Sequence, residues 1–177
     1  MQKYSPFYIS VIFTALSHIL IVEVHAMKLK TIAFPLLVGA VSGLLSSGAM
    51  QDFVLLEQPP LSPPGWLFPI VWTILYTLMG ISAYLIKSSD ASDEEKSDAL
   101  MFYRYQLIIN FLWPIFFFNF GWYLFSFFWL LLLWVLVILM IRRFDKISPT
   151  AAYINLPYLI WLTFAAYLNF SIWWLNR

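Results

Sequence analysis

The residues that could support chemistry in the apolar part of this 177-residue chain are tryptophan, tyrosine and asparagine. The chain has no cysteine, and its only histidines, His18 and His25, lie within residues 1–26. Beyond residue 26, every aspartate and glutamate falls between the apolar runs. A nucleophile with its base, a metal site and the intramembrane ionisable groups of proton pumps are therefore not expected there. The interactions that this part of the chain can offer a ligand are therefore ring stacking and hydrogen bonding.

Three stripes of such residues recur at helical spacing. At 100° per residue, residues three, four or eight positions apart lie near one helix face. The stripes pair Trp72 with Tyr76, Asn110 with Trp113, and Trp161 with Asn169. If they converge, they form an apolar pocket with a few hydrogen-bond donors, suited to a flat hydrophobic ligand. Alternatively, the asparagines only hydrogen-bond across helices. Both interpretations stay open for Asn110, and we favour the second for Asn169.

The composition indicates an integral membrane protein. Hydrophobic residues make up 62% of the chain and charged residues 11%, whereas a soluble domain is about a quarter charged. Apolar runs of about twenty residues indicate helices rather than a barrel. We expect an all-α, five-transmembrane-helix bundle as one ligand-binding domain over residues 27–177, with spans at residues 31–50, 66–86, 101–119, 122–141 and 150–174. The fourth span is apolar all round and is expected to face lipid.

Residues 1–26 carry an additional N-terminal hydrophobic segment outside that domain. Lys3, an apolar run over residues 4–24 and the ending Val24-His25-Ala26 fit a cleaved signal peptide. The run is long for that purpose, and Glu23 lies close to the proposed cleavage point. An uncleaved extra helix and a start of translation at Met27 are the alternatives, and we favour the extra helix.

Two loops and the basic residues set the expected orientation. A proline-rich loop, residues 51–65, and an acidic loop, residues 87–100, connect the first three of the five spans. Eight basic residues lie on the side of the acidic loop: Lys28, Lys30, Lys87, Lys96, Arg104, Arg142, Arg143 and Lys146. The positive-inside rule therefore predicts that loop 87–100 is cytoplasmic, in a membrane that we expect to be bacterial rather than organellar. The net charge of +1 argues against a nucleic-acid partner.

Small residues recur every four positions in the first of the five spans, at Gly39, Gly43 and Ser47. Such a stripe lets a neighbouring helix approach closely, because packing rather than hydrophobicity drives helix association in lipid. The stripe therefore predicts a helix–helix contact, and we favour this interpretation for Gly39.

Three motifs resemble the tryptophan-rich sensory protein or translocator protein family, also called peripheral-type benzodiazepine receptors. They read PPGWLFPIVWTILYTLMGISAYL, QLIINFLWPIFFF and INLPYLIWLTFAAYLNFSIWWLN, and the resemblance covers about residues 28–177. It implies a five-helix bundle with one ligand cavity beneath the first long loop. It also implies binding of porphyrins and other tetrapyrroles, as ligands rather than required cofactors, of sterols in some members, and of synthetic benzodiazepine-type ligands. Members often form homodimers.

Carried over by position, the resemblance implies a set of ligand-binding residues. The set comprises Gly43, Pro63, Pro64, Trp72, Asn110, Trp161 and Ala165, to which the helical stripes add Tyr76 and Trp113 and the loop adds Phe53. We favour a sensor or carrier that binds tetrapyrroles. The alternatives are an enzyme for light- and oxygen-dependent porphyrin breakdown, assigned to some similar proteins, with Trp72 and Trp161 as redox-active residues, and an assembly protein whose aromatic residues only fill the bundle.

The chain departs from the family pattern at three places. A Trp-Tyr pair that often opens the loop reads Asp52-Phe53, which removes a phenolic contact to the ligand. The Lys-Pro of the loop reads Gln58-Pro59, which removes a cationic partner for a porphyrin propionate. The final span lacks the sterol-recognition pattern, because Arg177 lies outside the window of that pattern.

Overall fold

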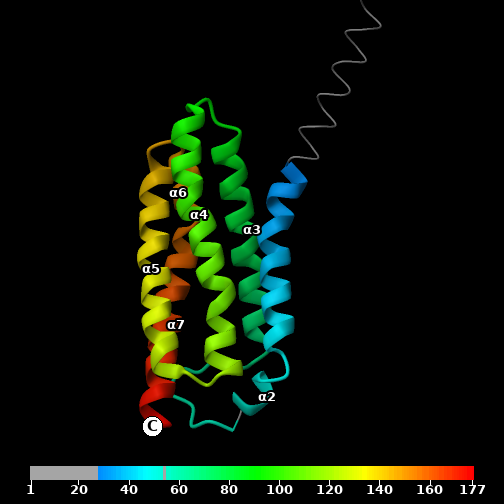
Figure 1. The fold of residues 1–177 in the computed structure, drawn as a ribbon, viewed down its shortest axis with the longest axis vertical. Helices are drawn as coiled ribbons and strands as arrows, with labels where there is room; N and C mark the ends of the chain where they lie inside the picture. Colours follow the sequence, from blue (N-terminus) through cyan, green and yellow to red (C-terminus); the bar gives the residue numbers. More distant parts are fainter. Residues whose placement is uncertain (1–27, 54) are drawn as a thin grey trace, which may run out of the picture.

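The computed structural model describes residues 28–53 and 55–177, in which all regular elements are helices (Figure 1). A first helix spans Lys28–Ser46. It is followed by α2 (Met50–Phe53), α3 (Leu67–Lys87), α4 (Asp93–Pro114), the π-helix η1 (Ile115–Asn119), α5 (Tyr123–Asp145), α6 (Pro149–Tyr153) and α7 (Leu156–Leu175). The interpretations of residues 1–26 fall outside the described residues.

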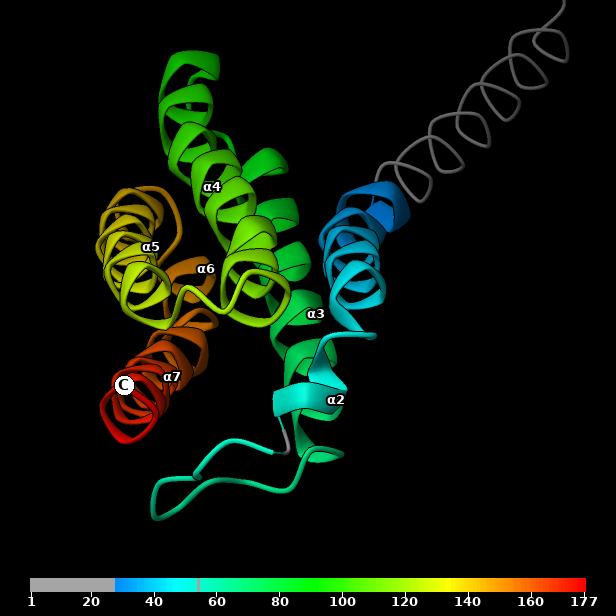
Figure 2. The same ribbon diagram turned by 60° about the horizontal axis from the view of Figure 1, so that its bottom comes forward.

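The helices form a bundle, and the chain is an all-α, multi-pass integral membrane protein (Figure 1 and Figure 2). Four helical segments are long and apolar enough to cross a membrane: Lys28–Ser46, Leu67–Lys87, Tyr123–Asp145 and Pro149–Leu175. α4 is more polar, but it runs alongside the others and keeps Gln106 and Asn110 buried. Polar groups inside a membrane normally face the interior of a bundle, so α4 fits as the fifth span.

Small residues bring the first helix against α3. A Cβ atom added at Gly39 would lie 2.1 Å from the ring of Tyr76. On the facing helix, a Cβ atom added at Gly80 would lie 2.7 Å from the backbone of Ile32. These distances leave no room for a larger residue, as expected where two helices approach closely in lipid. The predicted helix contact at Gly39 is confirmed.

The acidic segment is partly helical, so the prediction of a loop over residues 87–100 is wrong in its second half. α3 ends at Lys87 and α4 begins at Asp93. Ser92 caps α4: its hydroxyl accepts a hydrogen bond from the Glu95 backbone N–H, and the Glu95 carboxylate accepts one from the Ser92 backbone N–H. Hydrogen bonds from the Ser92 side chain and backbone lower the pKa of the Glu95 carboxyl. This capping box and the helix dipole favour a helix start where the charge count indicates only a solvated loop.

The span that is apolar all round, α5, faces lipid on one side as predicted, but its other side faces the interior of the bundle. Its buried residues recur at three- and four-residue spacing: Ser126, Leu130, Leu133, Val137, Met140 and Phe144. α5 packs against α4 and α7, while Phe128, Leu132 and Val135 are exposed. Apolar side chains suit the bundle interior and the lipid equally, so hydropathy did not separate the two faces.

The last predicted span is divided into α6 and α7. Ser148 caps α6 by accepting a hydrogen bond from the Ala151 backbone N–H, and Pro157 lies in the first turn of α7, where its missing donor costs little. Between the two helices, the buried Asn155 donates through Nδ2 to Oγ of Ser82 at 2.6 Å and to the Ala151 carbonyl at 2.8 Å. The bond to Ser82 ties the break between α6 and α7 to α3.

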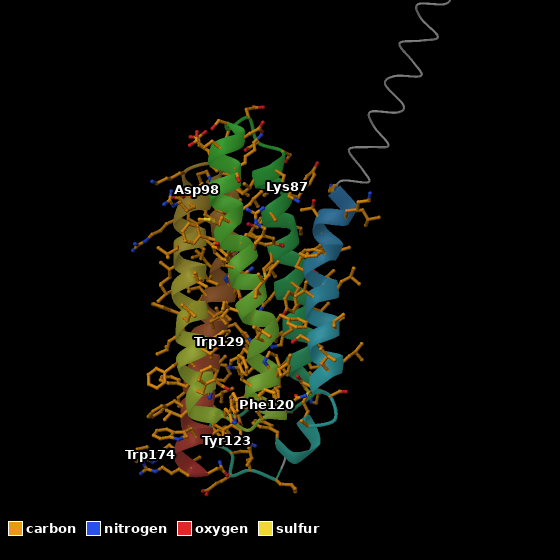
Figure 3. The ribbon with its side chains drawn as sticks, in the orientation of Figure 1. Lys87, Asp98, Phe120, Tyr123, Trp129 and Trp174 are labelled. Atoms are coloured by element: carbon orange, nitrogen blue, oxygen red, sulfur yellow. The ribbon has the colours of Figure 1, made fainter. Side chains whose placement is uncertain are left out.

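The two ends of the bundle carry different side chains (Figure 3). Lys87 and Asp98 lie at the end where α3 meets α4. Phe120, Tyr123 and Trp174 lie at the opposite end, near α2 and the C-terminus. The turns that the positive-inside rule assigns to the cytoplasm share one end, and which side of the membrane that end faces stays a prediction.

Candidate functional site

Aromatic side chains of α3 and α7 contact one another across the space between the two helices, and we call this group of side chains the aromatic wall. It consists of Phe68, Trp72 and Tyr76 of α3 and Tyr158 and Trp161 of α7. Ring centroids lie 5.5 Å apart for Trp72 and Tyr76, 6.3 Å for Trp72 and Tyr158, and 5.9 Å for Phe68 and Trp161. The four-residue spacing on α3 places its three rings on one helix face. Each predicted tryptophan therefore contacts a ring of the facing helix: Trp72 meets Tyr158, and Trp161 meets Phe68.

Polar groups border the aromatic wall at Tyr76 and Tyr158. Asn110 of α4 donates through Nδ2 to the Tyr76 hydroxyl at 3.2 Å. The Tyr158 hydroxyl donates to Oε1 of Gln106 at 3.0 Å, and Nε2 of Gln106 lies 3.9 Å from Sδ of Met79. All of these residues are buried. The Asn110 stripe therefore meets the α3 stripe, and the same bond is also a cross-helix contact, so both interpretations of Asn110 stay open.

The indole N–H of Trp161 is buried, and no described residue accepts a hydrogen bond from it. Its ring meets Phe68 edge-on at an interplanar angle of 73° and Phe164 at a centroid distance of 5.6 Å. Buried donors in native proteins are nearly always paired. An unpaired donor beside a surface of aromatic rings is suited to an acceptor on a bound molecule.

Trp113 and Asn169 join α4, α5 and α7. Nε1 of Trp113 donates to Oδ1 of Asn169 at 3.0 Å, and Nδ2 of Asn169 donates to the backbone carbonyl of Tyr123 at 2.8 Å. The Trp113 ring stacks on Phe117 with centroids 5.2 Å apart. The cross-helix bonding favoured for Asn169 is confirmed. The indole donor of Trp113 is occupied by this contact, and its part in ligand binding stays a prediction.

Four other predicted site residues lie on the first helix, the loop and α7. A Cβ atom added at Gly43 would meet nothing within 4 Å. Ala165 is buried on α7, one turn after Trp161. Pro63 is half-buried and Pro64 is exposed in the loop before α3. The ligand contacts of these residues stay predictions.

Phe53 anchors α2 to η1, the π-helix that follows α4. Its ring centroid lies 5.7 Å from that of Phe117 and 5.4 Å from that of Phe118. Phe53 therefore places the start of the loop over the same end of the bundle as the aromatic wall, and its contact with a ligand stays a prediction.

Two other kinds of candidate site, a surface groove and a metal site, are supported less well by the described residues. A groove of about 320 Å³ lies between the loop and α7, lined by Pro59, Pro60, Phe170, Ser171, Trp174 and Leu175. It contains none of the predicted site residues, and Trp174 in it is exposed. Within the described ranges, histidine, aspartate and glutamate form no group of three that could hold a metal ion. The aromatic wall remains the best-supported site.

Sequence reasoning missed Phe68, Gln106 and Tyr158 as residues of the site. Phe68 lies four positions before Trp72, and Tyr158 lies three positions before Trp161, so helical spacing would have found both. Gln106 shares a face of α4 with Asn110 but was not assigned to the site. The missing information was which face of α7 turns toward α3.

Comparison with known proteins finds similar sequences along most of the helical bundle. The family model described as TspO/MBR family matches residues 31–175. The tryptophan-rich protein TspO of Chlorobaculum tepidum is 35% identical over 124 residues, which cover 70% of this chain and 78% of the relative. Protein CrtK of Rhodobacter capsulatus is 36% identical over 138 residues, which cover 78% and 85%. The translocator protein of Ovis aries is 37% identical over 126 residues, which cover 69% and 73%.

Proposed function

The chain belongs to the TspO/MBR family, and from this premise we propose that it binds a flat, hydrophobic tetrapyrrole at the aromatic wall. It acts as a sensor or carrier for that ligand in the membrane. The resemblance to tryptophan-rich sensory proteins supports a tetrapyrrole ligand, and the name of the sheep translocator protein supports a carrier.

The observation that carries the proposal is the buried indole N–H of Trp161, from which no described residue accepts a hydrogen bond. A tetrapyrrole combines a wide apolar ring system with nitrogen and carboxylate acceptors. Each aromatic pair contributes about 0.5–1.5 kcal/mol beyond the burial of apolar area. A hydrogen bond from Trp161 contributes about 0.5–1.5 kcal/mol and removes the cost of a buried unpaired donor.

The polar neighbours of the aromatic wall set the expected orientation of the ligand. Asn110, Tyr76, Gln106 and Tyr158 are buried and bear amide or hydroxyl groups. A charged carboxylate buried among them would be costly, because the buried polar residues of the described chain include no lysine or arginine to pair with it. The carboxylates of the ligand are therefore expected to point toward the loop and water, with the uncharged ring against the wall.

A fluorescence titration with iron-free protoporphyrin tests the proposal on the full chain in lipid nanodiscs. Trp161→Phe keeps a stackable ring but removes the N–H, so porphyrin affinity should fall by about two- to tenfold. Trp134→Phe is the matched control, because its indole donates to Oγ1 of Thr163 on an exposed part of the bundle. That control should change affinity by less than about twofold. A wild-type chain that shows no saturable binding, or two variants of equal affinity, would contradict the proposal.

Two further experiments distinguish binding by ring stacking from porphyrin breakdown and from haem ligation. If illuminated wild-type protein breaks porphyrin down while Trp161→Phe binds porphyrin without breaking it down, Trp161 acts in catalysis rather than in binding alone. Residues 27–177 contain no histidine or cysteine, the ligands that many haem proteins use. Iron-free porphyrin should therefore bind at least as tightly as haem. Clearly tighter binding of haem, with a six-coordinate spectrum, would oppose recognition by ring stacking.

A further inference from the structure

The first helix and α3 lie side by side in the bundle (Figure 1 and Figure 2). They approach closely at Gly80, where an added Cβ atom would lie 2.7 Å from the backbone of Ile32. Farther along the same contact, toward the end of the bundle that carries Lys87 (Figure 3), two lysine side chains lie between the helices. We call this place the lysine seam, and it consists of Lys28, Thr31, Tyr84 and Lys87.

Each lysine of the lysine seam reaches across to the other helix. The ammonium group of Lys28 lies over the ring of Tyr84, with Nζ 5.7 Å from the ring centroid. In the opposite direction, Nζ of Lys87 donates to Oγ1 of Thr31 at 3.4 Å. Lys28 and Thr31 are three positions apart, as are Tyr84 and Lys87, so each pair shares a helix face. The two contacts therefore hold two positive charges within about one helical turn of each other.

No carboxylate of the described chain pairs with either charge of the lysine seam. The ion pair found among the described residues joins Arg143 of α5 to Asp98 of α4. The acidic residues that follow Lys87 most closely in the chain, Asp90 and Asp93, lie in the turn before α4 and at its start. Both lysines are exposed, so an anion from outside the chain can approach them, and it would relieve the repulsion between the two ammonium groups.

We propose that the lysine seam binds the headgroup of an anionic phospholipid. Basic sites between transmembrane helices on the cytoplasmic side recognise such headgroups, and the positive-inside rule predicts that this end of the bundle is cytoplasmic. Leu29 and Phe34 of the first helix are exposed, so the acyl chains of the same lipid can pack beside its headgroup. A soluble anion would lack this second contact. The bound phosphate would join the first helix to α3.

Native mass spectrometry of the full chain, titrated with phosphatidylglycerol in a mild detergent, measures the affinity for the first lipid bound. Phosphatidylcholine with the same acyl chains is the reference, because its headgroup has no net charge. Each lysine near anionic lipid contributes about fivefold in affinity. Lys28→Gln and Lys87→Gln should therefore each weaken phosphatidylglycerol binding by about fivefold, and the double variant should bind both lipids about equally. Lys87→Arg keeps the charge and should retain the preference.

The matched control combines Arg142→Gln with Lys146→Gln. These residues lie in the last turn of α5 and directly after it, and they remove the same charge from the same end of the bundle. Their affinity for phosphatidylglycerol should stay within about twofold of wild type. An equal loss in this control would overturn the lysine seam and assign the preference to the whole basic end. Wild-type protein with equal affinity for the two lipids would overturn it directly. Displacement of the lipid by excess inorganic phosphate would overturn the assignment to a lipid.

Thermal unfolding in nanodiscs supplies a second readout, because a lipid that binds the folded chain stabilises it. Phosphatidylglycerol should raise the unfolding midpoint of wild-type protein above its value in phosphatidylcholine, and the double variant of Lys28 and Lys87 should lose this gain. A double variant that keeps the gain would contradict the proposal. If the double variant fails to fold, Lys28→Gln alone tests it, since Lys28 makes a single ring contact. These measurements use no porphyrin, so their outcome is independent of the proposed function.

Discussion

Replacing Gly39 by alanine should displace Tyr76 of the aromatic wall, because Gly39 of the first helix lies against the ring of Tyr76. The added Cβ would stand 2.1 Å from that ring, whereas ordinary contact begins at 3.4 Å. The ring must therefore move by roughly 1.3 Å. Tyr76 is buried, accepts a hydrogen bond from Asn110 and packs on Trp72, so it cannot move without weakening these contacts.

The expected cost follows from three contributions. Overpacking of this kind costs about 1–3 kcal/mol, and weakening the bond from Asn110 to Tyr76 adds up to about 1 kcal/mol. The better helix propensity of alanine offsets up to about 1 kcal/mol. The free energy of unfolding should therefore fall by about 1–3 kcal/mol, or roughly 2–12 °C in the unfolding midpoint for a chain of this length.

Thermal unfolding in detergent, followed by intrinsic tryptophan fluorescence, measures this change. Gly43→Ala is the matched control on the same helix: its Cβ would meet nothing within 4 Å, so the midpoint should stay the same or rise. Adding Tyr76→Leu to Gly39→Ala should restore space, so the double variant should be more stable than the sum of the single effects predicts. Equal midpoints for the two alanine variants, or strict additivity in the double variant, would refute the contact.

Two further predictions concern the junction at Asn169 and the orientation of the chain. Asn169→Ala removes the hydrogen bonds to Trp113 and to the Tyr123 carbonyl. The free energy of unfolding should fall by about 1–2 kcal/mol, because interhelical hydrogen bonds in membranes average about 0.6 kcal/mol each. A double-mutant cycle with Trp113→Phe that shows no coupling would contradict the pairing. Cysteines placed at Gln58 and Ser89 of this cysteine-free chain should react with an impermeant thiol reagent in intact cells at Gln58 only, because the positive-inside rule predicts that Ser89 lies in the cytoplasm. The reverse pattern would invert the orientation.

The sequence alone determined the class of the protein and the extent of most of its spans. A bilayer requires about twenty apolar residues for each helix, and this requirement acts locally, so composition and run length reveal it. Helical periodicity is also local, which is why residue spacing by itself places Trp72 and Tyr76 on one helix face. The capping box of Ser92 with Glu95 is also a local pattern, and it was missed because a count of charges ignores the three-residue spacing that defines it.

Only the tertiary structure decided which stripes meet and which small residues pack. Gly39 and Gly43 are equivalent in the sequence pattern, yet one lies against Tyr76 and the other adjoins open space. The bond from Trp113 to Asn169 likewise joins segments whose sequences show no sign of their pairing. In lipid, apolar surface does not mark the inward face of a helix, so the rotation and height of each helix are set by packing and by cross-helix hydrogen bonds. These contacts form between distant parts of the chain, and local patterns do not encode them.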